Sequence, residues 1–546
     1  MQKKTFMRLT YLLLVFSALL SASTFAANSS VSTKIPDNFA LGIISTLRFD
    51  KFALLDNLKV SVHIAPPRIG DLLVQLQCPN GHLVTLHNRV GGTRHNLNVT
   101  YHVSDCENIQ VAGDWKLRIS DNVQGAAGSL LSWTMHSTAH KSTNALFHIG
   151  SIKGWTLIGN AITPGDNQLN VQVETLGKVE SLAVSIDKGS TQALTATGAG
   201  FAALVDISQL PPGEHTLSLT ANDSQTPFAT LPFQRSHPLY VLMTTDWDSA
   251  DSADSILRLH DKLHVEHPVL KFTHFFAPYT FTDPSVTPTR RAELVDWLLR
   301  LARDYQDEIG LHIHPFCNFV NTVPGVRCRF KPSDSYDKGD PTGYTVLSSA
   351  YSEQEYLQLL KAADALFTAH GLGKPTAFRT GSWAANAGTL KALVTDGFVV
   401  DSSANNWARI DEAQHEDNSM LWKWNRQHWR PINDTSQPYY PNTENPALAN
   451  QPVLPILEIP DNGSLVDYVT GTEMIDIFNA NWVGRPLVHP TTFVMGFHPV
   501  SYGQGFHQRI EKALAHIDYY LAATGEGPVV YESASHVAKV FGALRK

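Results

Sequence analysis

From about residue 240 to its end, the chain alternates short apolar segments with amphipathic helical stretches. One such stretch, residues 291–307, places Leu294, Leu298 and Leu301 on a single helical face. Eight apolar segments of strand length occur between residues 239 and 533. Strands that alternate with helices pair in parallel, and roughly 300 residues of this pattern predict a (β/α) barrel. We therefore expect one barrel over residues 237–546.

Residues 27–236 show a different pattern of apolar and polar residues. Apolar and polar residues alternate in short runs that Gly, Pro and Asn interrupt, which is typical of antiparallel sheets with one buried face. The pattern predicts two β-sandwiches, at residues 27–140 and 141–236. The second resembles an immunoglobulin-like spacer.

The first 26 residues have the composition of a secretory signal peptide. A basic start is followed by about ten apolar residues and then by small residues suited to cleavage after Ala26. The apolar run is shorter than the ~20 residues that cross a bilayer, although an uncleaved anchor is the alternative. We expect a secreted or periplasmic protein with no membrane span after cleavage.

The four cysteines fit an exported protein. Cys78 and Cys106 lie in the first predicted sandwich, and Cys317 and Cys328 lie in the barrel region. In an oxidising compartment two local pairs predict the disulfides Cys78–Cys106 and Cys317–Cys328.

The composition excludes some functions. The 42 basic and 50 acidic side chains give a formal net charge of −8, with no Lys/Arg-rich run, so nucleic acid is not an expected partner. With 43% hydrophobic and 17% charged residues, the chain can bury cores and is not intrinsically disordered.

Residues that bind metals or move protons stand at the ends of several predicted barrel strands, where barrels form their active sites. The first strand ends in Asp246 and Asp248, and the third ends in His312 and His314. Residues i and i+2 of an extended chain share a face, so both imidazoles can meet one ion. Two histidines and an aspartate suit a catalytic Zn²⁺ with an open water position. Helix capping by the aspartates and two core histidines are the alternative.

Three further strand ends carry Arg379, Asp401 and His498. They offer an orienting cation and a carboxylate–imidazole pair. Each alone is compatible with a structural role, but their joint order points to a catalytic site.

This order of motifs resembles the polysaccharide deacetylase (NodB-homology) family, metal-dependent carbohydrate de-N-acetylases with a distorted (β/α) barrel. The resemblance implies that Asp246 is the base and that the metal ligands are Asp248, His312 and His314. It also implies that Arg379 pairs with the base, that Asp401 orients the acid, and that His498 is the general acid. A backbone N–H near Gly381 or Ser382 would stabilise the oxyanion. The chain departs from the family in its HxH spacing, where HxxxH is common, in Trp247 between the aspartates, and in Thr380-Gly381 in place of prolines.

The resemblance implies a divalent metal, with zinc expected, and removal of N-acetyl or O-acetyl groups from a polysaccharide or cell-wall glycan. Aromatic side chains could stack on sugar rings or pack in the core: Trp383, Trp407, Trp422 and Trp424. A catalytically silent carbohydrate-binding protein and another amide or ester hydrolase on the same metal site are the alternatives.

The first predicted sandwich resembles the P domain (P/Homo B) of proprotein convertases, a β-jelly roll. The matching elements are Gly70-Asp71-Leu72, Pro79-Asn80-Gly81, Gly113-Asp114-Trp115, Ser120-Asp121 and the run from Gly128 to Trp133. That family accompanies subtilisin-like proteases, but we find neither a GTSxA nor a GxSxG motif. Asp71, Asp114 and Asp121 could bind Ca²⁺ or close Asx turns at strand ends.

Overall fold

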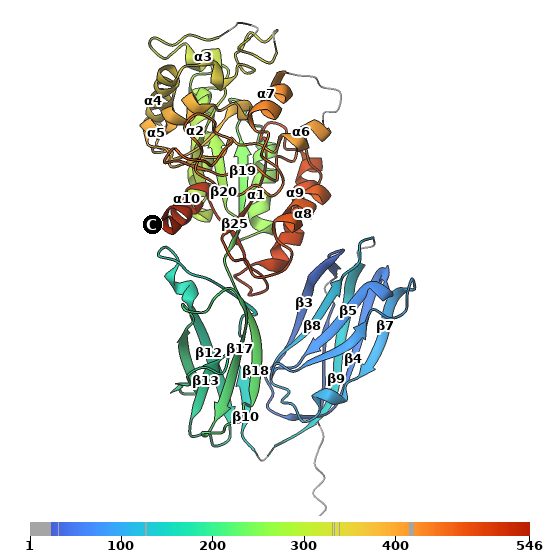
Figure 1. Cartoon of the computed structure of the whole chain (residues 1–546). Coiled ribbons are helices and arrows are strands. Elements are labelled where there is room, and N and C mark those ends of the chain that lie inside the picture. Colours follow the sequence, from blue (N-terminus) through green and yellow to red (C-terminus); the bar gives the residue numbers. More distant parts are fainter. Residues whose placement is uncertain are drawn as a thin grey trace, which may run out of the picture.

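The computed structural model describes residues 23–30, 32–125, 128–142, 144–329, 331, 333–337, 339–413 and 420–545. The parallel-strand region stands at one end of the molecule, with two β units below it in Figure 1. Of the predicted signal peptide, residues 1–22 lie outside the described part. Strand β1 (Ser23–Ser29) spans the expected cleavage point and pairs antiparallel with β9.

The first β unit contains two antiparallel sheets around one core, as the period-two alternation predicts. The first sheet contains β1, β2 (Thr33–Ile35), β4 (Leu54–Arg68), β7 (His95–His102) and β9 (Gly128–His140). The second contains β3 (Phe39–Phe49), β5 (Leu72–Gln77), β6 (Leu83–Asn88) and β8 (Gly113–Asp121). Trp115 and Trp133 are fully buried in this core.

The second β unit also contains two sheets. One contains β10 (Leu146–Ile149), β12 (Gln168–Leu176), β15 (Thr195–Ala196) and β16 (Gly200–Asp206). The other contains β11 (Trp155–Leu157), β13 (Leu182–Ile186), β14 (Gln192–Ala193), β17 (Gly213–Ala221) and β18 (Ala229–Ser236). Strand β11 pairs parallel with β18. The immunoglobulin-like assignment stays a prediction.

The C-terminal unit contains a curled parallel sheet, in the order β24-β23-β22-β21-β20-β19-β25 with β26 beside β19. Its strands are β19 (Leu239–Asp246), β20 (Phe272–Phe276), β21 (Glu308–Ile313), β22 (Ala377–Thr380), β23 (Val400–Asp401), β24 (Leu457–Glu458), β25 (Thr491–Phe497) and β26 (Val529–Tyr531). Strands β24 and β25 form the edges. The irregular segment 459–467 continues from β24 and bridges to β25, since the Gly463 N–H donates to the Val494 carbonyl of β25. The Asp461 N–H donates to the carbonyl of Ala404, which follows β23. The barrel is therefore distorted and only partly closed by ladders.

Helices cover this sheet. They are α1 (Asp254–Glu266), α2 (Pro288–Tyr305), α3 (Cys317–Val320), α4 (Glu353–Ala369), α5 (Ala387–Asp396), α6 (Trp407–Ala413), α7 (Met420–His428), α8 (Gly471–Asn481), α9 (Gln504–Ile517) and α10 (Ala534–Leu544). Ser352 and Glu355 form a capping box at the start of α4, which satisfies free N–H groups there. Within the described ranges no helix combines the length and hydropathy needed to cross a membrane.

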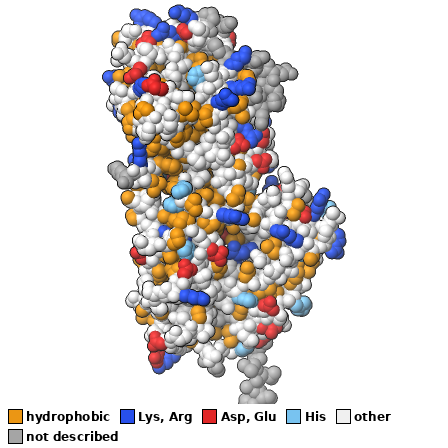
Figure 2. Space-filling view, in the orientation of Figure 1, with side chains coloured by type: hydrophobic (Ala, Val, Ile, Leu, Met, Phe, Trp, Pro, Cys, Tyr) orange, Lys and Arg blue, Asp and Glu red, His pale blue; other side chains and the backbone are white. Residues whose placement is uncertain are grey.

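All three units meet at one aromatic cluster. The Trp482 ring, which follows α8, lies 5.7 Å from Phe39 of the first unit and 5.7 Å from Trp155 of the second, between ring centroids. The Tyr520 hydroxyl donates to the Gly42 carbonyl at 3.1 Å. Figure 2 shows the resulting continuous surface, on which charged and hydrophobic side chains are interspersed. Buried rings therefore fix the β units to the end of the sheet where β19 begins.

Replacing Trp482 tests this junction. The side chain is 1% exposed, so Trp482→Ala should lower the free energy of unfolding by about 3–5 kcal/mol. Denaturant unfolding of the variant measures this loss. Val483→Ala, at a 62% exposed neighbour, is the control and should leave stability near wild type. Equal stabilities for the two variants would contradict the assignment.

The same junction should respond to acid through His516, whose ring centroid lies 6.1 Å from that of Phe39. Burial lowers the pKa of His516 from 6.5 to about 4. Because the folded pKa is the lower one, its contribution is present above pH 6.5 and is lost as the pH falls towards 4. In His516→Gln, which cannot take up this proton, Tm should fall less steeply over that range. Melting curves measured from pH 7 to pH 4 test this, and parallel curves for the two proteins would refute it.

Candidate active site

Asp246, the last residue of β19, and Asp248 share a face because Trp247 between them points the other way. Trp247 is buried against Phe276, with ring centroids 4.8 Å apart, and its carbonyl accepts from the Tyr279 hydroxyl. This anchors the backbone and directs Asp246 and Asp248 to the opposite side. The Asp-Trp-Asp sequence thus provides two carboxylates and their anchor.

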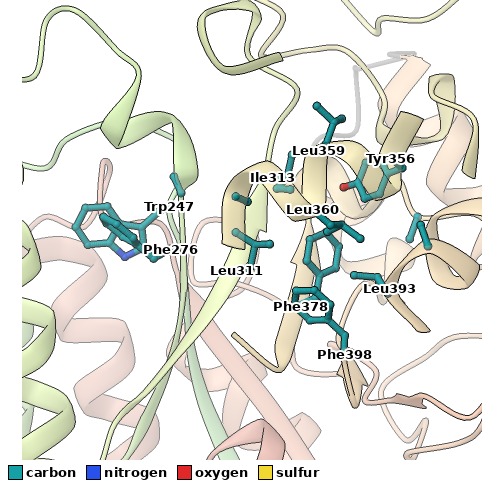
Figure 3. Packing of buried hydrophobic residues seen from close by; sticks show 14 of the residues in the cluster. Trp247, Phe276, Leu311, Ile313, Tyr356, Leu359, Leu360, Phe378, Leu393 and Phe398 are labelled. Carbon is teal, nitrogen blue, oxygen red and sulfur yellow. The ribbon is translucent and has the colours of Figure 1, made fainter. Parts of the chain in front are cut away.

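His312 in β21 and His314 just after it both meet Asp248, as the alternation predicts. The Nε2 atoms of His312 and His314 each lie 3.1 Å from Asp248 Oδ1. Leu311 and Ile313, the alternate residues, are fully buried in the core beneath the helices, and Figure 3 shows both among packed apolar side chains. The shorter HxH spacing therefore brings both imidazoles to one point.

These three side chains fit a divalent metal. His312 Nδ1 lies 2.8 Å from the Arg379 carbonyl, and His314 Nδ1 lies 2.8 Å from the Tyr344 carbonyl. A carbonyl only accepts, so both Nδ1 atoms carry hydrogen, and in neutral rings each Nε2 offers a lone pair to the Asp248 side. The three donor atoms lie within 4.8 Å of one another. Two imidazoles and a carboxylate are a donor set that zinc prefers.

Arg379 holds Asp246, the pairing that the family resemblance implies. Its Nη1 lies 3.0 Å from Asp246 Oδ1 and 2.9 Å from the hydroxyl of Thr244. Its Nε and Nη2 atoms donate to the carbonyl and hydroxyl of Ser402, both at 2.8 Å. The guanidinium is fully buried, so this fork has one orientation.

The carboxylate beside His498 is Asp467, which corrects the sequence prediction of Asp401. His498 Nδ1 lies 3.0 Å from Asp467 Oδ2, and Nε2 lies 3.4 Å from Asp248 Oδ2. Although burial lowers it, these two carboxylates raise the pKa of His498 to about 10. Asp467 is the last residue of the bridging segment 459–467, where sequence periodicity gives no signal.

Asp401 belongs to a buried carboxyl pair instead. Its Oδ1 accepts from the Ser403 hydroxyl at 2.7 Å, and burial raises its pKa to about 6. Burial and the adjacent Asp401 also raise the pKa of Glu458 well above its ordinary value. The backbone of β23, paired with both β22 and β24, fixes Asp401 in this interior.

The three residues proposed to bind substrate, Gly381, Ser382 and Trp383, lie in the turn that follows β22. A side chain at Gly381 would place its Cβ 2.6 Å from the His314 ring, so only glycine leaves room for that ligand. Ser382 and Trp383 both have positive φ, at 60° and 52°, a strained geometry typical of functional turns. Trp383 is 4% exposed and donates to Asp461 Oδ2 at 3.2 Å, so its ring packs inside the barrel.

The other tryptophans considered as sugar platforms also contact protein. Trp424 stacks on His428 at 3.8 Å between centroids, and Trp407 and Trp422 lie on the guanidinium of Arg426. Trp383 does line the cavity at the site, together with three tyrosines that the sequence prediction did not include. The cavity is about 80 Å³ in volume, and its lining residues are Asp246, Asp248, His312, His314, Tyr336, Tyr344, Thr380, Ser382, Trp383, Leu421, Tyr468 and His498. A larger cavity of about 560 Å³ lies where β19 begins, at the opposite end from this chemistry.

Both predicted disulfides are present, Cys78–Cys106 and Cys317–Cys328.

Asp71, Asp114 and Asp121 cannot bind one Ca²⁺ together. Asp114 and Asp121 stand near opposite ends of β8, roughly 23 Å apart at 3.3 Å per residue. Asp114 Oδ1 lies 3.6 Å from Arg48 Nη1 instead. Asp121 Oδ1 accepts from the Val123 N–H at 3.1 Å, the Asx turn that was the alternative.

Comparison with known families assigns the first β unit. Residues 55–137 match the family model described as proprotein convertase P-domain. The first β unit is a P-domain. Leupeptin-inactivating enzyme 1 of Streptomyces exfoliatus is 40% identical to this chain over 75 residues, 14% of this chain and 17% of that protein. That match takes in less than a fifth of the relative's length.

Beyond the P-domain, solved structures resemble a larger part of the chain. A protein described as a polysaccharide deacetylase from Mycobacterium smegmatis is 14% identical, covers 56% of this chain and 91% of its own, and has a TM-score of 0.34. A family 4 carbohydrate esterase from Streptomyces lividans, in complex with acetate, is 11% identical, with coverages of 55% and 93% and a TM-score of 0.26. Similarity at this level does not define an activity, which has to come from the site.

The reassignment of His498's partner gives a direct test. In chelator-treated protein, Asp467→Asn should lower the pKa of His498 from about 10, because a charge that favours the imidazolium is removed. Asp401→Asn should leave that pKa unchanged. NMR titration of the His498 ring measures both. A drop caused by Asp401→Asn alone would restore the original pairing.

Proposed function

We propose that the chain is a metal-dependent hydrolase that removes acetyl groups from a glycan. The observation that carries this proposal is the convergence of Asp248 Oδ1 with the Nε2 atoms of His312 and His314 at 3.1 Å. Two ion pairs flank that point: Asp246, the proposed base, with Arg379, and His498, the proposed acid, with Asp467. The resemblance to polysaccharide deacetylases rests on the same residues.

The side chains divide the reaction between them. A divalent ion, with zinc expected, would be held by Asp248, His312 and His314 and would act as a Lewis acid that lowers the pKa of water. Asp246, paired with Arg379, would accept the proton of the attacking water. His498, held by Asp467, would donate a proton to the departing amine or alcohol.

The remaining groups would stabilise the developing oxyanion. The backbone turns at Gly381 and Ser382, where φ of Ser382 is positive, so their N–H groups are candidates for donation to the acyl oxygen. Loss of one such donor typically costs about 10²–10³ in kcat.

The size of the cavity supports a small acyl group. At about 80 Å³ it is well below the roughly 300 Å³ or more of pockets that enclose whole ligands. An acetyl group would enter and the sugar would stay outside. An N-acetylated or O-acetylated polysaccharide or cell-wall glycan is therefore the proposed partner.

The proposed location is outside the cytoplasm, in the periplasm or secreted. Two disulfides support an oxidising compartment, in agreement with the N-terminal sequence.

Metal content and acetate release together test the function. His312→Ala and Asp248→Ala should lose the metal, because each removes one of three ligands. Asp246→Asn should keep the metal and lose activity by about 10²–10⁴-fold, as expected for loss of a general base. His82→Ala, in an exposed loop, is the control. Elemental analysis and acetate assays on acetylated glycans give both readings.

Two results would overturn the proposal. Equal metal content in wild type, His312→Ala and Asp248→Ala would remove the metal site. Bound metal without acetate release from any glycan would favour a silent carbohydrate-binding protein.

A further inference from the structure

Tyr344 contacts two of the three proposed metal ligands. Its hydroxyl donates to Asp248 Oδ2 at 2.7 Å, because a carboxylate can only accept. Its backbone carbonyl accepts from His314 Nδ1 at 2.8 Å. Its ring also stacks on the His314 imidazole, with centroids 4.4 Å apart and planes 22° apart. One residue thus orients a carboxylate and an imidazole at once.

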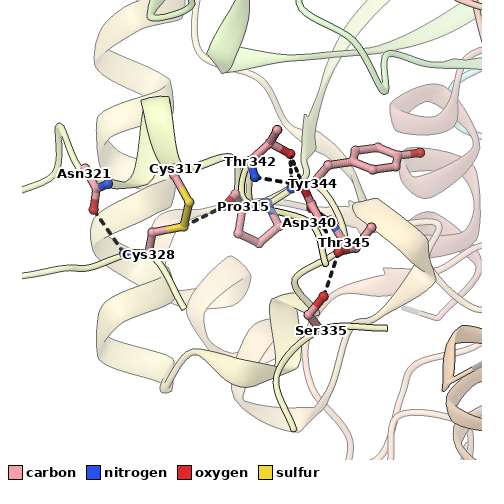
Figure 4. The surroundings of a disulfide bond; sticks show 9 residues. All are labelled: Pro315, Cys317, Asn321, Cys328, Ser335, Asp340, Thr342, Tyr344 and Thr345. Atoms are coloured by element: carbon pink, nitrogen blue, oxygen red, sulfur yellow. Dashed lines mark hydrogen bonds between the residues drawn. A yellow bond between two sulfur atoms is a disulfide. The ribbon is translucent and has the colours of Figure 1, made fainter. Parts of the chain in front are cut away.

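A tightly bonded turn holds Tyr344 in place. Both carboxylate oxygens of Asp340 accept within it: Oδ1 from the N–H and hydroxyl of Thr342, at 2.7 and 2.6 Å, and Oδ2 from the N–H and hydroxyl of Thr345, both at 2.9 Å. Figure 4 shows this turn beside the disulfide. Four hydrogen bonds to one charged side chain make the turn rigid.

The turn is bonded to the segment that directly follows β21 and His314. The Cys317 N–H, three residues beyond His314, donates to the Thr342 carbonyl at 2.7 Å. Gly343 has φ +88°, and a Cβ there would lie 2.6 Å from the Pro315 carbonyl oxygen and 2.9 Å from Cys317 Sγ. The turn therefore packs directly against the disulfide Cys317–Cys328.

This arrangement assigns separate tasks to the two oxygens of Asp248. Oδ1 faces His312 and His314, while Oδ2 is occupied by the Tyr344 hydroxyl and lies 3.4 Å from His498. Without the hydroxyl, the carboxylate could rotate and present Oδ1 away from the imidazoles. Partners that orient metal ligands typically contribute 10–100-fold in metal affinity.

We propose that Tyr344 is a positioning residue that fixes Asp248 and His314 for metal binding through the turn built on Asp340. The inference rests on the proposed function. It also gives a physical reason why an HxH spacing can serve here: the second histidine receives its orienting carbonyl from this turn.

Tyr344→Phe tests the hydroxyl, because it keeps the ring and the backbone carbonyl. Its Kd for Zn²⁺, from competition with a chelator, should rise about 10-fold or more, and the visible spectrum of the Co²⁺-loaded protein should change. Asp340→Ala should weaken Zn²⁺ binding in the same direction without touching a ligand. Tyr439→Phe is the matched control, since it loses a 2.7 Å hydrogen bond to the Pro446 carbonyl, and should bind Zn²⁺ like wild type.

The possible outcomes separate the two proposals. If wild type binds no Zn²⁺, the proposed function fails and the inference fails with it. If wild type binds Zn²⁺ but Tyr344→Phe has the same affinity and Co²⁺ spectrum, only the inference is overturned. A lower Tm of metal-free Tyr344→Phe with unchanged Zn²⁺ affinity would also overturn it, because the hydroxyl would then serve stability alone.

Discussion

The carboxylate of Asp248, whose side chain is 13% exposed, is the constraint on which the rest of the site depends. Burial of a charge costs several kcal/mol unless partners compensate for it. Although burial raises the pKa of Asp248, the charge of His498 holds it well below its ordinary value. His498 in turn needs Asp467 to remain oriented and charged. Each charge placed in this interior requires another, so the catalytic groups form one connected network.

The architecture separates this network from the β units. The residues that line the small cavity all come from the barrel, at the ends where β19 and β21 finish. The P-domain and the second unit are attached where β19 begins, through Phe39, Trp155 and Trp482. Their buried rings stabilise the barrel from the opposite end, which leaves the active-site face to its own loops (Figure 1).

Much of the fold was predictable because its signals are local. Alternation placed His312 and His314 on one face and Leu311 and Ile313 on the other, and the structure confirms both. The βα repeat predicted the parallel sheet, and the P-domain resemblance is confirmed by the family model. Asp467 and Tyr344 were missed because irregular segments position them through long-range hydrogen bonds. Such bonds leave no periodic pattern in the chain.

The sequence by itself determined which chemical groups are available and which strand ends carry them, since side-chain direction along a strand follows from its two-residue period. Only the tertiary structure decided which groups are partners. Asp401 and Asp467 are both acidic and both near the sheet, yet the pairing of β23 with β22 and β24 buries Asp401 against Glu458. The segment that bridges β24 and β25 brings Asp467 to His498 instead. Partner choice depends on distances of a few ångströms between segments far apart in the chain, and packing sets those distances.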